Sequence, residues 1–379
     1  MGIKQLQEGF LRRTIIILIA ASTAIAGVPA LAQSARSVTA PPPPPPPATS
    51  VQPPKAAPDM QSVLDALASL GGKPIETLTP AEARMQPSAA DGAKAAMQKK
   101  GMSTAPDPSV TTQDLPYGSD PKQFARIYKP ADAPMGGKPM PVIVYYHGGG
   151  WVIADVNTYD AAPRAMAKAL NAIVVSVEYR HAPEFKFPAQ HDDAAAAYRW
   201  TLRNAASWGG DPAQIATVGE SAGGNLAVAT AIYARDNGLT VPRHIVSVYP
   251  IANSSMTLPS RKDSANAKPL NAAMLPWFGY YYQTSKTDAQ DPRLNLVAAN
   301  LRGLPPTTII NAQIDPLRSD GETLAAAMRA AGDKVEQKTF PGVTHEFFGM
   351  AKVVNGAEQA NDLAVARLRA AFAAPASRH

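Results

Sequence analysis

Short, uninterrupted apolar runs alternate with alanine-rich stretches through most of this chain. The apolar runs lie at residues 142–146, 172–177, 215–218, 245–249 and 308–312. The alanine-rich stretches of helical character lie at residues 160–170, 192–206, 223–236 and 320–332. Apolar runs without polar alternation are typical of strands that are covered on both faces, as in a parallel sheet. This alternation predicts a doubly wound α/β domain, with a mostly parallel central sheet flanked by helices.

The first 58 residues have a different composition. Residues 14–26 are uncharged and mostly apolar, follow Arg12 and Arg13, and precede Ala30-Leu31-Ala32. This order predicts a secretory signal peptide over residues 1–32, and therefore an exported protein, periplasmic or secreted. A retained membrane anchor is the alternative. The segment 14–26 is shorter than the roughly 20 apolar residues that a spanning helix needs, so we expect no stable membrane span after signal cleavage.

Residues 33–58 are proline-rich and contain an unbroken proline run from Pro41 to Pro47. Such a run adopts an extended polyproline II conformation and cannot pack a core. We therefore expect a semi-rigid linker here. A ligand for the aromatic groove of an unknown partner is the alternative.

Residues 59–379 form the predicted α/β domain, and two segments of it depart from the alternation. Residues 59–101 carry apolar side chains at helical spacing, and Thr79-Pro80 is typical of a helix start. Residues 252–300 form a long insertion that contains the aromatic run 277–282. Ligands bind at the carboxyl edge of the strands in open α/β sheets, so we expect both segments to form a helical cap over that edge.

Composition excludes several classes of site. The chain has no cysteine, which excludes disulfides, thiolate metal sites and a cysteine nucleophile. The net charge is +6, but the lysines and arginines are scattered, with no basic run interleaved with aromatic residues. We therefore expect no binding of nucleic acid.

Ser221 is the candidate nucleophile. It lies in the run Gly219-Glu220-Ser221-Ala222-Gly223-Gly224, between the predicted strand 215–218 and a helix over 225–235. The Gly-x-Ser-x-Gly pattern alone is weak, but a strand, a sharp turn and a helix are the context in which such a serine is exposed to substrate. A glycine-rich turn with an incidental serine is the alternative.

A serine hydroxyl needs a general base, and the base needs an acid that orients it. In hydrolases of this type the chain order is serine, acid, histidine. Of the six histidines, His345 and His379 lie well downstream of Ser221, and His379 ends a polar tail, so His345 is the candidate base. Asp315 follows the predicted strand 308–312 and is the candidate acid. Asp320 is its rival, but its position favours capping of a helix.

The glycines that follow strand 142–146 are candidates for an oxyanion hole. Consecutive glycines can turn backbone N–H groups toward a developing oxyanion. Gly149 and Gly150 are the preferred donors, Gly148 is a further candidate, and Ala222 supplies a third N–H group. His147, which begins this run, is interpreted as structural.

Other candidates are weaker. Four residues are assigned to the substrate pocket, with packing as the alternative for the aromatic ones: Trp151, Glu220, Trp277 and Phe278. Asp192 and Asp193 precede an alanine-rich helix, so we interpret them as capping residues, not as partners of His181 and His191 in a metal site. No metal and no cofactor are expected.

Four motifs in order resemble those of the hormone-sensitive-lipase-like esterases, bacterial family IV. They are the runs 147–151, 179–184 (Tyr-Arg-His-Ala-Pro-Glu), 219–224 and 315–318 (Asp-Pro-Leu-Arg), with His345 as the base. The resemblance covers residues 60–375. It implies a capped α/β-hydrolase that cleaves small-molecule esters of short or medium acyl chains through an acyl-enzyme, and it allows a homodimer.

The chain departs from the family pattern at Glu220, Glu346 and Ser319-Asp320, where other residues are common. None of these departures removes a catalytic atom, but they leave the substrate open. A lactonase or a carbohydrate deacetylase would use the same triad. A non-catalytic small-molecule receptor is a further alternative, since the plant gibberellin receptor shows that this family can lose its base.

Overall fold

The computed structural model describes residues 54–133 and 137–375. The predicted signal peptide, residues 1–32, and most of the predicted linker therefore lie outside the described residues. The first helix, α1, begins at Pro58, at the end of the predicted linker. No helix within the two described ranges is both long enough and apolar enough to cross a membrane.

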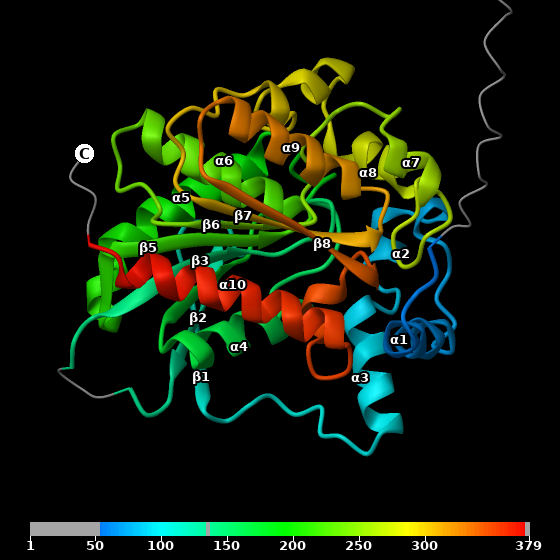
Figure 1. Ribbon diagram of the computed structural model, residues 1–379, viewed down its shortest axis with the longest axis horizontal. Coiled ribbons are helices and arrows are strands. Elements are labelled where there is room, and N and C mark those ends of the chain that lie inside the picture. Colours follow the sequence, from blue (N-terminus) through cyan, green and yellow to red (C-terminus); the bar gives the residue numbers. More distant parts are fainter. Residues whose placement is uncertain (1–53, 134–136, 376–379) are drawn as a thin grey trace, which may run out of the picture. The chain divides into compact units, whose positions relative to one another are not determined.

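One mixed sheet organises the described residues (Figure 1). Its strands are β1 Val110–Pro116, β2 Phe124–Pro130, β3 Met140–Tyr146, β4 Ile173–Val177, β5 Gly210–Glu220, β6 Ile245–Val248, β7 Thr307–Ile314 and β8 Val335–Thr344. The strand order is β1-β2-β4-β3-β5-β6-β7-β8. β1 pairs with β2, and β2 with β4, in antiparallel fashion, and all remaining pairs are parallel. The predicted mostly parallel sheet is thus confirmed.

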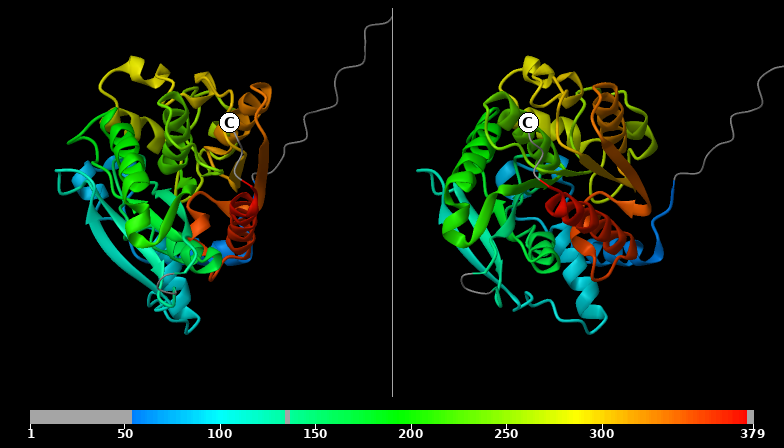
Figure 2. Two further views of the ribbon diagram at one scale, coloured as in Figure 1. Left: turned by 90° about the vertical axis from the view of Figure 1, so that its left-hand side faces the viewer. Right: turned by 60° about the vertical axis from the view of Figure 1, so that its left-hand side comes forward.

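Helices cover both faces of this sheet (Figures 1 and 2). The α-helices are α1 Pro58–Ala68, α2 Pro80–Ala83, α3 Ala89–Lys99, α4 Ala161–Leu170, α5 Ala189–Asn204, α6 Ala222–Asp236, α7 Pro259–Asp263, α8 Met274–Tyr282, α9 Arg318–Ala330 and α10 Asn355–Ala373. Short 3-10 helices span Ile75–Thr77, Ala205–Trp208, Lys286–Gln290, Leu296–Ala298 and Phe347–Met350. α4 and α10 lie on one face, and α5, α6 and α9 lie on the other.

The core explains why the strands have no polar alternation. In β3, Val142 and Val144 belong to the buried cluster that includes residues of α5, α6 and α9, whereas Ile143 and Tyr145 belong to the cluster that includes residues of α4 and α10. All four side chains are fully buried. Each such side chain contributes about 1.5–3 kcal/mol relative to its exposed state, so apolar residues are favoured at every position of the strand.

The carboxyl ends of the parallel strands are covered by helices from two distant segments. α1, α2, α3, α7 and α8 gather at the end of the sheet toward which the arrow of β8 points (Figure 1). α2 begins as the sequence predicts: Glu82 N–H donates to Thr79 Oγ1 at 3.3 Å, and Thr79 N–H donates to Glu82 Oε2 at 2.9 Å. The start of α1 is tied to β8, because the N–H of Ala57, the residue before α1, donates to the carbonyl oxygen of Gly342 at 2.8 Å.

The three aspartates predicted to cap helices do not do so. Asp192 and Asp193 lie inside α5, which begins at Ala189, and the buried carboxylate of Asp193 pairs with Arg180 at 2.7 Å. Asp320 lies inside α9, pairs with Arg261 at 2.7 Å, and accepts a hydrogen bond from Ala252 N–H at 3.1 Å. A buried carboxylate needs an opposite charge or hydrogen-bond donors, and Asp193 and Asp320 find them outside their own helices.

Candidate active site

Ser221 lies on a sharp turn between β5 and α6. Its φ of 57° and ψ of −116° lie outside the common regions for a residue with a side chain, a conformation that costs about 1–3 kcal/mol. The surrounding hydrogen bonds maintain it, since Ser221 N–H donates to the carbonyl oxygen of Val248 at 2.8 Å. Glycine is required at 219 because a Cβ there would lie 2.0 Å from the carbonyl oxygen of Gly223.

The structure brings Ser221, His345 and Asp315 together. His345 Nε2 lies 2.9 Å from Ser221 Oγ, and His345 Nδ1 lies 2.7 Å from Asp315 Oδ2. Each of the three is the first residue after a strand, β5, β8 and β7 respectively, so the parallel sheet places them at one edge. The other oxygen of Asp315 accepts the N–H of Leu317 at 2.7 Å, which fixes the carboxylate as the chain enters α9.

The charges around His345 favour the protonated form of its imidazole. Burial opposes the charge, but the Asp315 carboxylate, with Glu346 and Glu220, raises the pKa of His345 above the ordinary value of 6.5. Glu346 Oε1 lies 3.8 Å from His345 Nε2. The Tyr159 hydroxyl holds both Glu346 oxygens, at 2.7 and 2.6 Å. Tyr159 was not predicted as a site residue, and its contact with Glu346, 187 residues away, leaves no local pattern in the sequence.

Glu220 lies behind the nucleophile and not on the pocket wall where the sequence places it. Its side chain is 1% exposed and accepts hydrogen bonds from the hydroxyls of Tyr145 and Tyr249. Burial, assisted by the negative charge of Glu346, raises the pKa of Glu220 to about 7. Glu220 does not line the cavity that contains Ser221, and its negative charge contributes to the raised pKa of His345.

The predicted oxyanion loop packs directly against the nucleophile turn. Gly149 has φ 92°, and a Cβ at this position would lie 2.0 Å from the carbonyl oxygen of Ile153. Gly149 and Gly150 line the same cavity as Ser221 and His345, whereas Gly148 does not line it. Ala222 is the first residue of α6, so its N–H group has no helical partner and is available to an anion.

A cavity of about 1130 Å³ opens above these groups. Both predicted cap segments contribute to its wall. The apolar residues of the wall include Leu64, Leu67, Ile75, Ile251, Met274, Leu275, Phe278 and Leu317. Charged residues of the wall include Lys73, Glu76, Arg84, Asp91, Lys268 and Glu346.

Of the aromatic residues assigned to the pocket, Phe278 lines the cavity and the two tryptophans do not. Trp151 stacks on Tyr282, with 4.3 Å between the ring centroids and 12° between the planes. The indole N–H of Trp277 donates to the carbonyl oxygen of Leu78 at 2.8 Å. Both tryptophans therefore pack the region behind the wall, and Trp277 also ties α8 to the N-terminal segment.

Comparisons with known proteins agree with this geometry. Residues 143–349 match the family described as alpha/beta hydrolase fold. The chain is 37% identical to Carboxylesterase NlhH of Mycobacterium tuberculosis over 330 residues, which cover 85% of this chain and 99% of that protein. It is 33% identical to an ethyl acetate hydrolase of Pseudomonas putida over 260 residues, 67% of this chain and 78% of that protein.

A solved structure shows the same fold. An esterase of Pyrobaculum calidifontis matches with a TM-score of 0.72 and 32% identity, over 84% of this chain and all of that chain. These relatives are enzymes of ester hydrolysis, which favours a hydrolase over the receptor alternative. The chain therefore belongs to the hormone-sensitive-lipase-like carboxylesterases of the α/β-hydrolase superfamily, and it is a serine hydrolase that acts on carboxylic esters.

Proposed function

We propose that Ser221, His345 and Asp315 are the catalytic triad of this hydrolase. Ser221 Oγ attacks the ester carbonyl carbon while its proton passes to His345 Nε2, and the Asp315 carboxylate stabilises the imidazolium that forms. The tetrahedral intermediate then breaks its bond to the alcohol oxygen, which leaves with the proton from Nε2. Water then attacks the carbonyl carbon of the acyl-enzyme while its proton passes to His345 Nε2. The carboxylic acid is released as Ser221 Oγ takes that proton back. The proposal rests on two contacts of His345, with Nε2 2.9 Å from Ser221 Oγ and Nδ1 2.7 Å from Asp315 Oδ2.

The oxyanion of the intermediate is held by the N–H groups of Gly149, Gly150 and Ala222. The proposal follows from their place around Ser221: two lie on the cavity wall and the third begins α6. Such donors are already in place before the charge develops, and loss of one typically costs ~3 kcal/mol in the barrier.

The substrates are esters of short to medium acyl chains. Support comes from the cavity of about 1130 Å³, whose wall above Ser221 includes Phe278, Met274 and Leu275. The segments 59–101 and 252–300 act as the cap that encloses the acyl chain. The relative from Pseudomonas putida is named for hydrolysis of a short ester, ethyl acetate. A series of p-nitrophenyl esters from acetate to palmitate tests the range, and a maximum kcat/KM at palmitate would contradict it.

The enzyme works outside the cytoplasm. Support comes from the basic start, the apolar residues 14–26 and the small residues before Gln33. Fractionation of cells that express the full chain tests this, because export predicts a shortened chain in the periplasm or medium. A full-length chain in the cytoplasm would contradict it.

The nucleophile is tested with Ser221→Ala and the matched control Ser176→Ala. Ser176 is fully buried in β4, and its hydroxyl has no hydrogen-bond partner among the described residues. We expect Ser221→Ala to abolish hydrolysis of p-nitrophenyl butyrate at an unchanged circular dichroism spectrum, and Ser176→Ala to retain it. Hydrolysis at the wild-type rate by Ser221→Ala would overturn the assignment.

A further inference from the structure

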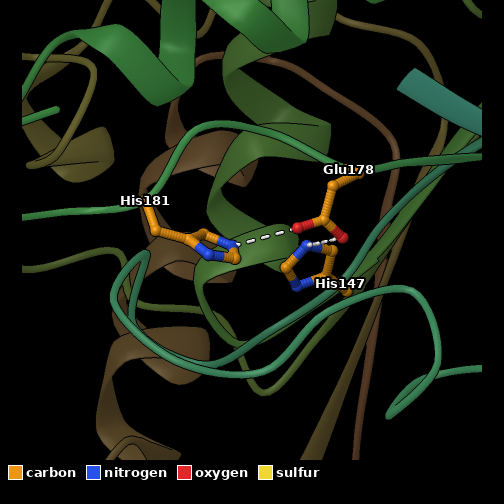
Figure 3. A group of neighbouring side chains, drawn as sticks. All are labelled: His147, Glu178 and His181. Carbon is orange, nitrogen blue, oxygen red and sulfur yellow. Dashed lines mark ion pairs between the residues drawn. The ribbon is translucent and has the colours of Figure 1, made fainter. Parts of the chain in front are cut away.

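A second group of chemically active side chains lies outside the triad, at the ends of β3 and β4. His147 is the first residue after β3, Glu178 is the first after β4, and His181 follows three residues later. Because β3 and β4 are parallel neighbours, the three side chains converge (Figure 3). His147 Nε2 lies 3.7 Å from Glu178 Oε2, and His181 Nε2 lies 3.6 Å from Glu178 Oε1.

These side chains are buried without adequate partners. His147 is 0% exposed, Glu178 1% and His181 8%. Within residues 54–133 and 137–375, no hydrogen-bond partner reaches Nε2 of either histidine or Oε1 of the glutamate. Buried polar atoms are nearly always hydrogen-bonded, so three unpartnered atoms facing one another require an explanation.

The tautomer of His147 leaves a lone pair that points into this cluster. His147 Nδ1 lies 2.9 Å from the carbonyl oxygen of Gly148, an acceptor, and the Tyr179 hydroxyl 3.3 Å from Nδ1 donates to the carbonyl oxygen of His147 at 2.8 Å. We therefore assign the proton to Nδ1, which leaves Nε2 free to bind a cation. The Tyr179 ring stacks on the imidazole at 4.2 Å and holds its plane. A histidine whose second nitrogen donates to a backbone carbonyl is the usual arrangement of a metal ligand.

We propose that His147, Glu178 and His181 bind a divalent metal ion of the zinc class, with a water molecule as the fourth ligand. Ligand atoms about 2.0–2.1 Å from a tetrahedral metal lie roughly 3.4 Å apart. The distances of 3.6 and 3.7 Å run from the two histidines to different oxygens of Glu178, and each is within a few tenths of an ångström of that value. With one ligand atom taken from each residue, the three atoms lie within 4.8 Å of one another. Two imidazoles and one carboxylate are a ligand set that zinc favours.

This proposal contradicts the expectation of no metal. The site also differs from the cluster of His181 and His191 with Asp192 and Asp193 that the sequence suggested. His191 is separate, because its Nε2 lies 2.9 Å from the side-chain oxygen of Asn225, and Asp193 pairs with Arg180. The decisive residue, Glu178, belongs to no motif, and only the pairing of β3 with β4 brings it to His147.

One cation already faces the cluster. Lys122 Nζ lies 3.8 Å from Glu178 Oε1, and its side chain is 56% exposed, so we expect the metal to enter from this side and to displace the ammonium group. The Val156 N–H donates to Glu178 Oε2 at 3.0 Å and orients the carboxylate.

The bound ion has a structural role in the active site. It ties His147, the residue before Gly148, to the end of β4, and so fixes the start of the loop that carries Gly149 and Gly150. The ion contacts no reacting atom, so we expect its presence to be measured first as Zn²⁺ binding and as a higher thermal stability of the protein.

The test uses the full chain, freed of metal by dialysis against a chelator. Zn²⁺ is titrated at pH 8 by calorimetry, and Co²⁺ replaces it for absorption spectroscopy. We expect one equivalent of Zn²⁺, a tetrahedral Co²⁺ spectrum, and a rise in Tm of about 5 °C at 100 times Kd. No binding at millimolar Zn²⁺, or an octahedral spectrum, would overturn the proposal.

Two cluster variants and a histidine control locate the ion. His181→Leu and Glu178→Gln should weaken Zn²⁺ binding by at least about 100-fold. His244→Gln is the control, since His244 is buried elsewhere and lies 2.9 Å from Thr308 Oγ1. Unchanged binding in both cluster variants would refute the site. If the variants do not fold, anomalous diffraction from a Zn²⁺-soaked wild-type crystal decides, because the peak must lie between the three side chains.

Discussion

Replacement of Asp315 by asparagine tests whether catalysis needs the correct orientation and tautomer of His345, and not merely its presence. Asp315 is fully buried, with one oxygen 2.7 Å from His345 Nδ1 and the other 2.7 Å from the N–H of Leu317. Asparagine has the same shape and can keep the bond to Leu317 through its oxygen. Its NH₂ group then faces Nδ1, which must become an acceptor, so the ring proton moves to Nε2. A histidine protonated at Nε2 cannot accept the proton of Ser221.

The expected loss is large. A wrong tautomer with intact geometry lowers kcat about 10⁴-fold in serine hydrolases with this arrangement. At about 1.4 kcal/mol for each factor of ten, the barrier rises by about 5.5 kcal/mol. The substrate contacts the cavity wall and not Asp315, so KM should change little.

Asp320→Asn is the matched control. Asp320 is equally buried, lies five residues further along the chain, and pairs with Arg261 at 2.7 Å. Leaving one partner of a buried ion pair alone costs about 3–5 kcal/mol, so this variant should lose stability and keep kcat within about tenfold.

The assay is steady-state hydrolysis of p-nitrophenyl butyrate, with circular dichroism and Tm measured for both variants. More than about a tenth of the wild-type kcat in Asp315→Asn would contradict this prediction, and so would an equal loss of activity in folded Asp320→Asn.

Three further outcomes follow from other contacts. Glu346→Gln should shift the acid limb of the kcat/KM profile to lower pH, since a carboxylate 3.8 Å from His345 Nε2 favours the imidazolium and its removal lowers the pKa; an upward shift would contradict this. Gly149→Ala should lower kcat at least about 100-fold, because the new methyl group meets the carbonyl oxygen of Ile153 at 2.0 Å and displaces the N–H donor. Met60→Ala should lower the free energy of unfolding by about 2–5 kcal/mol in urea titrations, since Met60 is fully buried; an unchanged midpoint would show that α1 adds nothing to the core.

Much of this site could be predicted because its chemistry follows the ends of the strands. Ser221 and Asp315 lie three residues beyond the apolar runs 215–218 and 308–312, and in the structure all three triad residues directly follow parallel strands, whose ends meet at one edge. Chain order then left few assignments for the base and the acid. The central strands β3 to β7 were predictable as apolar runs because burial on both faces excludes most polar residues from them, whereas β8, at the edge of the sheet, carries Glu336, Gln337 and Lys338.

Features that depend on distant partners could not be predicted. β1 was missed because it pairs antiparallel at the edge of the sheet, with Val110 as its one buried residue and polar residues after it. The capping roles predicted for Asp193 and Asp320 are wrong because these carboxylates pair with Arg180 and Arg261, and neither ion pair leaves a pattern in the sequence. Trp151 follows the oxyanion glycines in sequence, yet its ring turns to Tyr282, 131 positions further on.

The contact between α1 and β8 affects the order in which the enzyme folds. The hydroxyl of Thr344, the residue before the catalytic histidine, contacts Met60 Sδ, 284 positions earlier in the chain. Contacts of such long range close late during folding, since the entropy of a large loop must be lost before they stabilise anything. The cavity therefore gains its wall from α1 only near the end of folding. Partly folded chains should contain the sheet and lack hydrolytic activity, so that recovery of activity lags behind recovery of secondary structure on refolding.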